Sequence, residues 1–217
     1  MHTTTQYRTL DEAFAHFNAR MFDGRLPSCL ITLQRRGNSR GYFIGDGFRA
    51  RHGNQVTDEI ALNPDTFATR TDSEILSTLV HEMVHLWQHH LGQPPRRAYH
   101  DRQWADRMES IGLMPSDTGA PGGKRTGARC THYIIAGGPF DQAVAAFLSG
   151  GKVALTWASV GGDSAAKAKS AASKTKFTCP VCRQNAWAKP GAVLMCGDLE
   201  MHDKPELMVA EPAPAGP

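Results

Sequence analysis

The sequence of 217 residues lacks any long hydrophobic run. No stretch approaches the roughly 18 consecutive apolar residues of a transmembrane helix, so we expect neither a membrane span nor a membrane partner. The first residues, MHTTTQYRTLDEAF, also lack the basic and then apolar pattern of a cleaved signal peptide. Together these absences predict a cytoplasmic protein, with nucleoid association following if the protein binds DNA.

Cysteine is scarce, with five residues in the whole chain. An odd number of cysteines does not favour a disulfide framework. Cys179 and Cys182 form a C-x-x-C pair, which predicts metal binding in a reducing compartment. Cys130 lies two residues before His132, and neither has a matching partner nearby in the sequence. We therefore assign both to a strand and not to a metal site.

Lysine is absent from residues 1–117, which carry 13 arginines against 14 acidic residues, a net charge of −1. Residues 118–190 carry 10 basic residues against 2 acidic ones, a net charge of +8. Residues 191–217 carry 1 lysine against 5 acidic residues, a net charge of −4. The basic segment favours contact with nucleic-acid phosphates, and a solvated linker remains the alternative.

Helical and extended patterns follow one another through the first half of the chain. Thr9 and Glu12 have capping-box spacing, so we expect a first helix from there to residue 21. Short β-type runs at residues 29–34, 41–48 and 59–62 precede two more helices, over residues 71–91 and 101–111. This order predicts an α+β domain.

His81-Glu82-Met83-Val84-His85 is an H-E-x-x-H motif inside the second of these helices. Histidines four residues apart lie one helical turn apart on the same face, so His81 and His85 can both bind one zinc ion. Glu82 then lies beside the water that zinc activates, where it can accept a proton as general base. A chance match of this motif is expected in only about 2% of chains of this composition.

A catalytic zinc ion usually has three protein ligands and one open position. His89 lies eight residues after His81, about 12 Å along the helix axis, which is too far for both to bind one ion. Two candidates remain for the third ligand. His100 follows a double proline that turns the chain back toward the metal, and we favour it. Glu109, on the next helix, is the alternative.

The C-terminal cysteines have the spacing of a zinc ribbon with one ligand missing. Cys179 and Cys182 form the first knuckle and Cys196 begins the second, but position 199, where a fourth cysteine is expected, carries leucine. His202 and Asp198 are the candidate replacements. We favour His202 because imidazole commonly joins three thiolates.

Four segments, HEMVHLWQHHLG, YHDRQWADRMESIGL, THYIIAGGPFD and FTCPVCRQNAWAKPGAVLMCGD, resemble the SprT-like metallopeptidases, which are related to the DNA–protein crosslink protease Spartan. The resemblance spans roughly residues 10–199. It implies a minimal zincin fold, His100 as third zinc ligand within a pattern that includes Trp104, and a C-terminal zinc ribbon. It also implies zinc-dependent proteolysis, directed in some members at DNA-bound proteins.

Composition and resemblance together predict five segments. They are a SprT-like zincin domain (8–117), a basic connection with a small strand–helix–strand segment (118–160), a flexible basic linker (161–176), a degenerate zinc ribbon (177–205) and a disordered tail (206–217). The linker sequence GGDSAAKAKSAASKTK is of low complexity.

The predicted activity is zinc-dependent endopeptidase, in which a zinc-activated water attacks a peptide carbonyl with Glu82 as general base. The predicted partners are a protein substrate and DNA, the latter through residues 118–202, and a second zinc ion has a structural role in the ribbon. The alternative is a nucleic-acid-associated accessory protein whose H-E-x-x-H site is only structural. The presence of Glu82 argues against it, and a site closed by four protein ligands would favour it.

Overall fold

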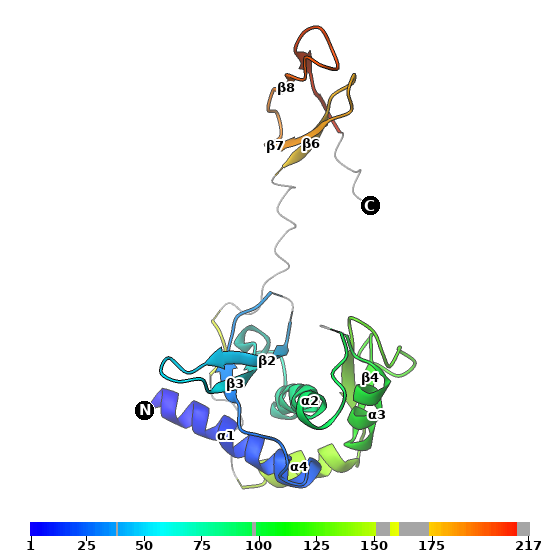
Figure 1. The fold of residues 1–217 in the computed structure, drawn as a ribbon. Coiled ribbons are helices and arrows are strands. Elements are labelled where there is room, and N and C mark those ends of the chain that lie inside the picture. Colours follow the sequence, from blue (N-terminus) through cyan, green and yellow to red (C-terminus); the bar gives the residue numbers. More distant parts are fainter. Residues whose placement is uncertain (38, 97–98, 151–156, 161–173, 212–217) are drawn as a thin grey trace. The chain divides into compact units, whose positions relative to one another are not determined.

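The computed structural model describes residues 1–37, 39–96, 99–150, 157–160 and 174–211, in two compact units, Met1–Asp163 and Ser164–Pro217 (Figure 1). Most of the predicted linker, residues 151–156 of the predicted strand–helix–strand segment and residues 212–217 of the predicted tail lie outside the described residues. Within the described residues, no helix combines the length and apolar character that crossing a bilayer requires.

The first unit has an α+β fold, as predicted. Its elements are α1 (His2–Met21), β1 (Leu30–Leu33), β2 (Gly41–Arg49), β3 (Val56–Leu62), the short 3-10 helix η1 (Pro64–Thr66), α2 (Asp72–Leu91), α3 (Arg102–Ser110), β4 (Leu113–Ser116), β5 (Thr131–Ile134) and α4 (Pro139–Leu148). The described part of the chain thus contains four α-helices and small sheets, while the predicted domain boundaries remain a prediction.

A three-stranded sheet with the order β1-β3-β2 forms one side of the first unit. β3 is parallel to β1 and antiparallel to β2, which leaves β2 at an edge. The β2–β3 register shifts between Ile44 and Phe48, where β2 bulges. Ile60 and Leu62 of β3 are fully buried, so the C-terminal half of the central strand contributes to the core.

α2 is the central helix of the first unit. It contacts β2 and β3 as well as α1, α3 and α4, and Figure 1 shows it end-on between the sheet and the α3–β4 segment. Thr71 and Glu74 form the predicted capping box, with the Thr71 backbone N–H donating to Glu74 Oε2 at 2.7 Å. Apolar residues on several sides of α2, from Ile75 to Leu86, are buried. The H-E-x-x-H motif therefore belongs to a helix covered by protein.

α1 begins at His2, seven residues before the expected start. The prediction from Thr9 was wrong because the Thr9 hydroxyl donates within the helix to the carbonyl of Thr5, at 3.0 Å, and caps nothing. α1 packs against α4, where the rings of Phe17 and Phe140 stack with centroids 5.6 Å apart. Residues well beyond position 117 are thus part of the same core as the N-terminal helix.

β4 and β5 form an antiparallel pair that returns the chain to α2. β4 was not expected, because Pro115 marked only the end of the preceding helix. Gly112 turns the chain into β4 with φ of +89°, and a Cβ there would lie 2.9 Å from the backbone nitrogen of Phe140. The β4–β5 register pairs Pro115 with His132. This pairing places His132 beside α2.

The second unit is small and all-β in its described part. Its elements are β6 (Thr175–Thr178), β7 (Asn185–Ala188), β8 (Met195–Cys196), β9 (Glu206–Leu207) and β10 (Val209–Ala210). β6 lies between β7 and β10, and β8 pairs with β9. Its core consists of Phe177, Cys179, Cys196 and Met208. The strands β9 and β10 lie within the stretch predicted as a tail, because backbone pairing with β8 and β6 and burial of Met208 hold them.

Candidate metal centres

The structure brings together the three histidines that the sequence selected. His81 and His85 lie on α2, and His100 lies just before α3. One ligand atom from each lies within 4.8 Å of the others. The ring centroids are 5.3 Å apart for His81 and His85, and 5.4 Å and 4.9 Å from these two to His100. Three imidazole donors at this spacing match the protein ligands of a catalytic zinc site.

His100 is held by the strand-like segment that passes beside it. Its backbone forms two hydrogen bonds with Gly127, each 2.9 Å long. Its Nδ1–H donates to the carbonyl of Gly127 at 3.0 Å. With Nδ1 protonated, the lone pair of the ring is on Nε2, which is the nitrogen available to a metal.

The residue that follows His100 ties α3 to α2. Asp101 caps α3 by accepting the backbone N–H of Trp104 at 2.9 Å, and it also accepts the side-chain amide of Gln88 at 2.8 Å. Gln103 Oε1 accepts the backbone N–H of Gln93 at 2.7 Å and so holds the turn between the two helices. These contacts fix the return of the chain that the double proline predicted.

Trp104 packs against all three histidines. Its side chain is fully buried, and its ring centroid lies 4.9, 5.3 and 4.4 Å from those of His81, His85 and His100. A rigid aromatic ring that contacts each imidazole restricts their rotamers. Trp104 is therefore the apolar support of the histidine cluster.

A hydrogen-bonded chain of side chains orients His81 from behind. Ser77 Oγ–H donates to the carbonyl of Glu74 at 2.8 Å, so the Ser77 oxygen can accept the Nε2–H of His132, also at 2.8 Å. His132 Nδ1 then accepts the Nδ1–H of His81 at 3.1 Å. Each donor in this series of hydrogen bonds has one acceptor. The arrangement leaves Nε2 of His81 free to bind a metal.

The sequence predicts a strand at Cys130 and His132, and this is correct for His132 but wrong for Cys130, which lies just before β5. It assigns His132 no role at the site. Fifty-one positions separate it from His81, and no local spacing links the two residues. The only signal was that His132 belongs to THYIIAGGPFD, one of the four segments that carry the family resemblance.

Burial decides the protonation of the histidine cluster. It lowers the pKa of His81 well below its ordinary value, with smaller contributions from the neighbouring His132 and His85. Burial also lowers the pKa of His85 and of His132 to about 3. Neutral imidazoles are the form that binds metal, so the donor set fits zinc at neutral pH.

Glu82 is buried beside the edge strand. Its side chain is 5% exposed, and burial raises its pKa to about 8. β2 passes so close that a Cβ on Gly41 would lie 3.2 Å from Glu82 Oε1 and 2.8 Å from the carbonyl oxygen of Ala61. Glu109, the alternative third ligand, is exposed and pairs with Arg125 at 2.5 Å, outside the histidine group.

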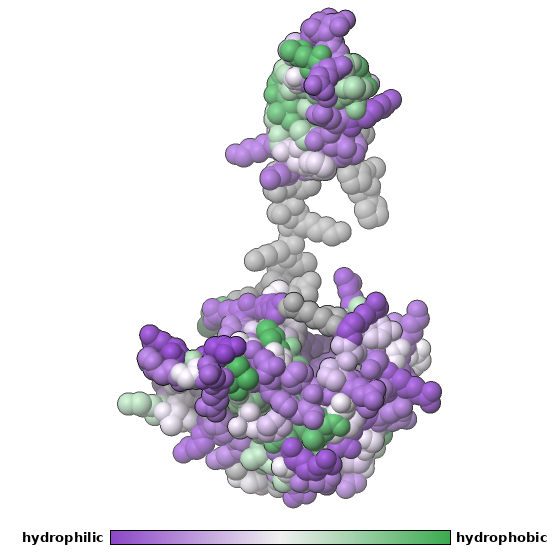
Figure 2. Space-filling view, viewed as in Figure 1, coloured by the Kyte–Doolittle hydropathy of each residue, from purple (hydrophilic) through white to green (hydrophobic). Residues whose placement is uncertain are grey.

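The histidines open into a cleft of about 1230 Å³ between β2, α2 and the segment before β5. Its lining includes four arginines, Arg36, Arg40, Arg96 and Arg129. Two acidic residues, Glu82 and Asp117, also line it. The visible surface of the first unit is mostly hydrophilic, with small separate apolar patches (Figure 2). The cleft thus combines a buried polar centre with a basic rim.

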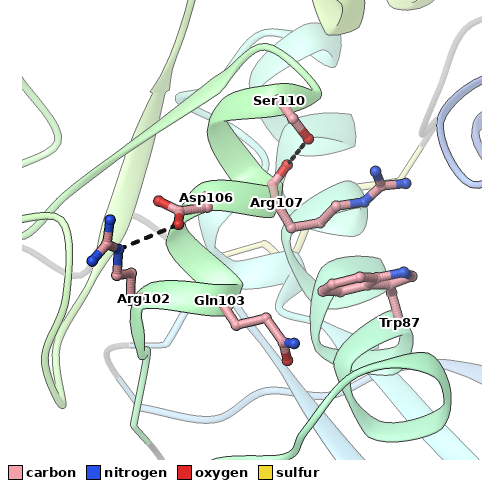
Figure 3. Close-up of a pocket in the computed structure, with 6 residues that line it drawn as sticks. All are labelled: Trp87, Arg102, Gln103, Asp106, Arg107 and Ser110. Carbon is pink, nitrogen blue, oxygen red and sulfur yellow. Dashed lines mark hydrogen bonds and ion pairs between the residues drawn. The ribbon is translucent and has the colours of Figure 1, made fainter.

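A second hollow, of about 510 Å³, lies between α2 and α3 (Figure 3). Trp87 and Arg107 line it, and the guanidinium lies 5.2 Å from the indole centroid. Arg107 also donates to the carbonyl of Met21 at 2.5 Å, which fastens α3 to the end of α1. Its lining among the described residues includes no residue of the histidine cleft and no histidine or cysteine.

The predicted ribbon residues also converge. Cys179, Cys182, Cys196 and His202 present ligand atoms within 4.8 Å of one another. His202 Nδ1–H donates to the carbonyl of Lys204 at 2.8 Å, which leaves Nε2 facing Cys179 Sγ at 3.8 Å. Although burial raises the pKa of Cys179, backbone N–H groups and neighbouring thiols lower it to about 7. The set has the chemistry of a structural zinc site.

The alternatives considered for the fourth ribbon position lie elsewhere. Asp198 Oδ2 accepts the side-chain amide of Gln184 at 3.0 Å and is not part of the cysteine group. Leu199, at the position where a ribbon cysteine is expected, is 64% exposed. The extra residues before His202 form a turn that brings its imidazole back to the thiols.

Comparisons with known proteins identify a family and a relative. A sequence model of the SprT-like family matches residues 10–125, which include the histidine cluster. The chain is also 40% identical over 58 residues to a Salmonella typhimurium protein described as an uncharacterized protein in the mucB 3' region. That match covers 27% of this chain and 78% of the relative, whose description assigns no activity.

We expect His132→Ala to weaken zinc binding at the histidine cluster by about 10–100-fold, because His81 loses the acceptor that fixes its ring. Competition with a chromogenic chelator measures the affinity. Tyr133→Phe, a change on the same strand outside the cleft, is the control. Equal zinc affinity in His132→Ala and wild type would contradict the orienting role.

We expect His202→Ala to weaken metal binding at the cysteine group, because a tetrahedral site loses its fourth donor. Cobalt substitution reports this directly, through thiolate-to-metal absorption that only the cysteine group produces. Asp198→Ala should leave the cobalt titration unchanged. If Asp198→Ala binds cobalt more weakly than His202→Ala does, the fourth ligand is Asp198 and not His202.

Proposed function

The chain belongs to the SprT-like family, and from this premise we propose that it is a zinc-dependent endopeptidase. Membership of the family indicates a metallopeptidase-like domain. The observation that carries the proposal is the convergence of His81, His85 and His100 next to Glu82 in an open cleft. Among the described residues, this group has three members, whereas a purely structural zinc site is normally closed by four protein ligands.

Each residue of the site has a distinct task. His81, His85 and His100 would hold zinc through neutral imidazole nitrogens, two of them oriented by hydrogen bonds at Nδ1. When bound, zinc lowers the pKa of a water molecule to about 7 and polarises a carbonyl. Glu82 accepts the proton of the attacking water and can deliver it to the leaving amine. A bound zinc ion would favour the carboxylate form of Glu82, which is the form that accepts the proton of the water.

The edge strand β2 supports a peptide substrate. Among the described residues, β2 has a sheet neighbour on one side only, and its residues Gly41–Gly45 line the cleft. An extended peptide can bind such an edge through backbone hydrogen bonds, which place a scissile carbonyl without demanding particular side chains. The arrangement of a buried H-E-x-x-H helix beneath an edge strand supports the zincin layout.

DNA-associated proteins are the proposed substrate class. The support is the +8 net charge of residues 118–190 and the four arginines that line the cleft. We further propose that the second unit is a zinc ribbon whose structural zinc ion is bound by the cysteine group. The cytoplasm, where thiolates stay reduced, is the proposed location. In the alternative function, a nucleic-acid-associated accessory protein, the same zinc ions would be retained without turnover.

We expect Glu82→Gln to abolish peptide hydrolysis while the zinc content stays unchanged. Glutamine keeps the shape of the side chain but cannot accept a proton, and the loss of a general base costs about 10²–10⁴-fold in rate. Turnover of an unfolded protein substrate, with metal content measured on the same samples, tests this. Glu109→Gln, an exposed acid outside the cleft, is the matched control, and hydrolysis by Glu82→Gln at the control's rate would refute the mechanism.

We expect DNA affinity to reside mainly in the basic segment and to fall steeply with salt. Replacing Lys174, Arg183 and Lys189 with glutamine should lower affinity and reduce the slope of log K against log salt by up to about 3, since each phosphate contact contributes about 0.9. Fluorescence anisotropy with labelled single- and double-stranded DNA measures both.

The control for the DNA experiment is a variant of equal charge change in the first unit. Arg8, Arg20 and Arg51 are exposed and lie outside the cleft. Replacing these three with glutamine should change affinity less than the first set does. An equal or larger loss would mean that the basic segment acts only as a linker.

A further inference from the structure

A third group of metal-binding side chains lies at the C-terminal end of α2 and takes no part in the proposed hydrolysis. Asp58 on β3 faces His89 and His90 in the last turn of α2, and one ligand atom from each lies within 4.8 Å of the others. We propose that these three residues form a second metal site in the first unit, for a divalent transition-metal ion such as zinc. The proposal is independent of the proposed endopeptidase activity.

The distances within the group suit one ion. His90 Nε2 lies 2.6 Å from Asp58 Oδ2, and His89 Nε2 lies 3.9 Å from Asp58 Oδ1. In a tetrahedral zinc site, ligand atoms about 2.1 Å from the metal are about 3.4 Å apart. One separation is longer and one shorter than that value, so adjustment of the side chains around a common centre would suit one ion.

A fourth donor lies close to the group. Asp46 Oδ2 is 3.9 Å from His89 Nε2, the same distance as Asp58 Oδ1. Asp46 has φ of +53° and lies in the β2 bulge, so its exposed carboxylate extends from the strand toward α2. Asp46 stands outside the three residues whose ligand atoms lie within 4.8 Å of one another, so it would become a fourth ligand only if its exposed side chain moved closer.

The fold fixes the donors before any metal arrives. Asp58 is only 3% exposed, and its Oδ1 accepts the backbone N–H of Asp46 at 2.8 Å. The backbone of β2 lies close to the His89 ring, since a Cβ on Gly45 would lie 2.7 Å from the Cε1 atom of His89. The two histidine side chains keep 30% and 36% of their surface exposed. The site is thus preorganised on its inner side and open to an ion on its outer side.

An ion pair between His90 and Asp58 explains only part of this arrangement. It satisfies Asp58 Oδ2, but it gives no reason for His89 to face the other oxygen of the same carboxylate. Imidazole together with carboxylate suits zinc and other first-row divalent metals, whereas calcium and magnesium prefer sites made of oxygen. The donor set therefore selects the chemical class of the ion.

The new site shares no residue with the histidine cluster. His89 lies one helical turn, about 6 Å along the axis, beyond His85, and both rings lie near Phe43 of β2. A metal bound by Asp58, His89 and His90 would join the last turn of α2 to β2 and β3. Because His89 also lines the cleft, this link fixes one end of the substrate-binding surface.

The test is a zinc count on the full chain. Metal-free wild type, His89→Gln and His90→Gln are dialysed against zinc and analysed by mass spectrometry, with protein folding checked by circular dichroism. We expect one zinc equivalent fewer in each variant than in wild type. His52→Gln, which changes an exposed histidine outside all three groups, is the matched control and should bind as much zinc as wild type.

A second experiment, in a variant that lacks the histidine cluster, distinguishes this site from the proposed catalytic site. In His81→Ala, which disrupts the histidine cluster, adding His89→Gln should still remove one further equivalent. Equal zinc counts in wild type and both glutamine variants would overturn the proposal, as would the same loss in His52→Gln. If His90→Gln fails to fold because its ion pair is lost, His89→Gln decides alone, since His89 makes no close hydrogen bond to Asp58.

Discussion

The burial of α2 is the constraint on which the site depends. Because an unpaired buried polar group is costly, a helix that contacts a sheet and three other helices creates a demand for hydrogen-bond partners at its buried polar side chains. His81 meets this demand through His132 and Ser77. Burial keeps the imidazoles neutral, and neutral imidazole is the form that binds metal. The burial of α2 thus stabilises the fold and also keeps the histidines in the protonation state that can bind a metal.

The segments around α2 set the positions of His81, His85 and His100. The bulged strand β2 closes on Glu82 through a glycine at position 41, because any side chain there would collide with the sheet and the helix. On the opposite side, Asp101 and Gln88 join α3 to α2, and Trp104 fills the space behind the rings. A metal-binding geometry of this kind is most reproducible on rigid elements supported by a second layer of contacts.

Local pattern predicted much of the fold and of the site, while long-range pairing limited the rest. The capping box at Thr71 and the H-E-x-x-H spacing depend on neighbours within one helical turn, so sequence alone located them. His132 reaches His81 only through the β4–β5 pairing, and no residue spacing encodes that contact. Thr9 shows the opposite error, in which a local motif that resembles a helix start lies inside a longer helix.

The packing of α4 on α1 has a consequence for the order of folding. Phe140 and Phe147 complete a core that begins at Leu10, so the first and last helices of the first unit need each other for burial. Contacts between residues so far apart in sequence are slow to form, because a long loop must close before they give any stabilisation. During synthesis, the central helix would stay partly uncovered until α4 leaves the ribosome. His81, His85 and His100 would therefore leave the ribosome before the core that encloses them is complete.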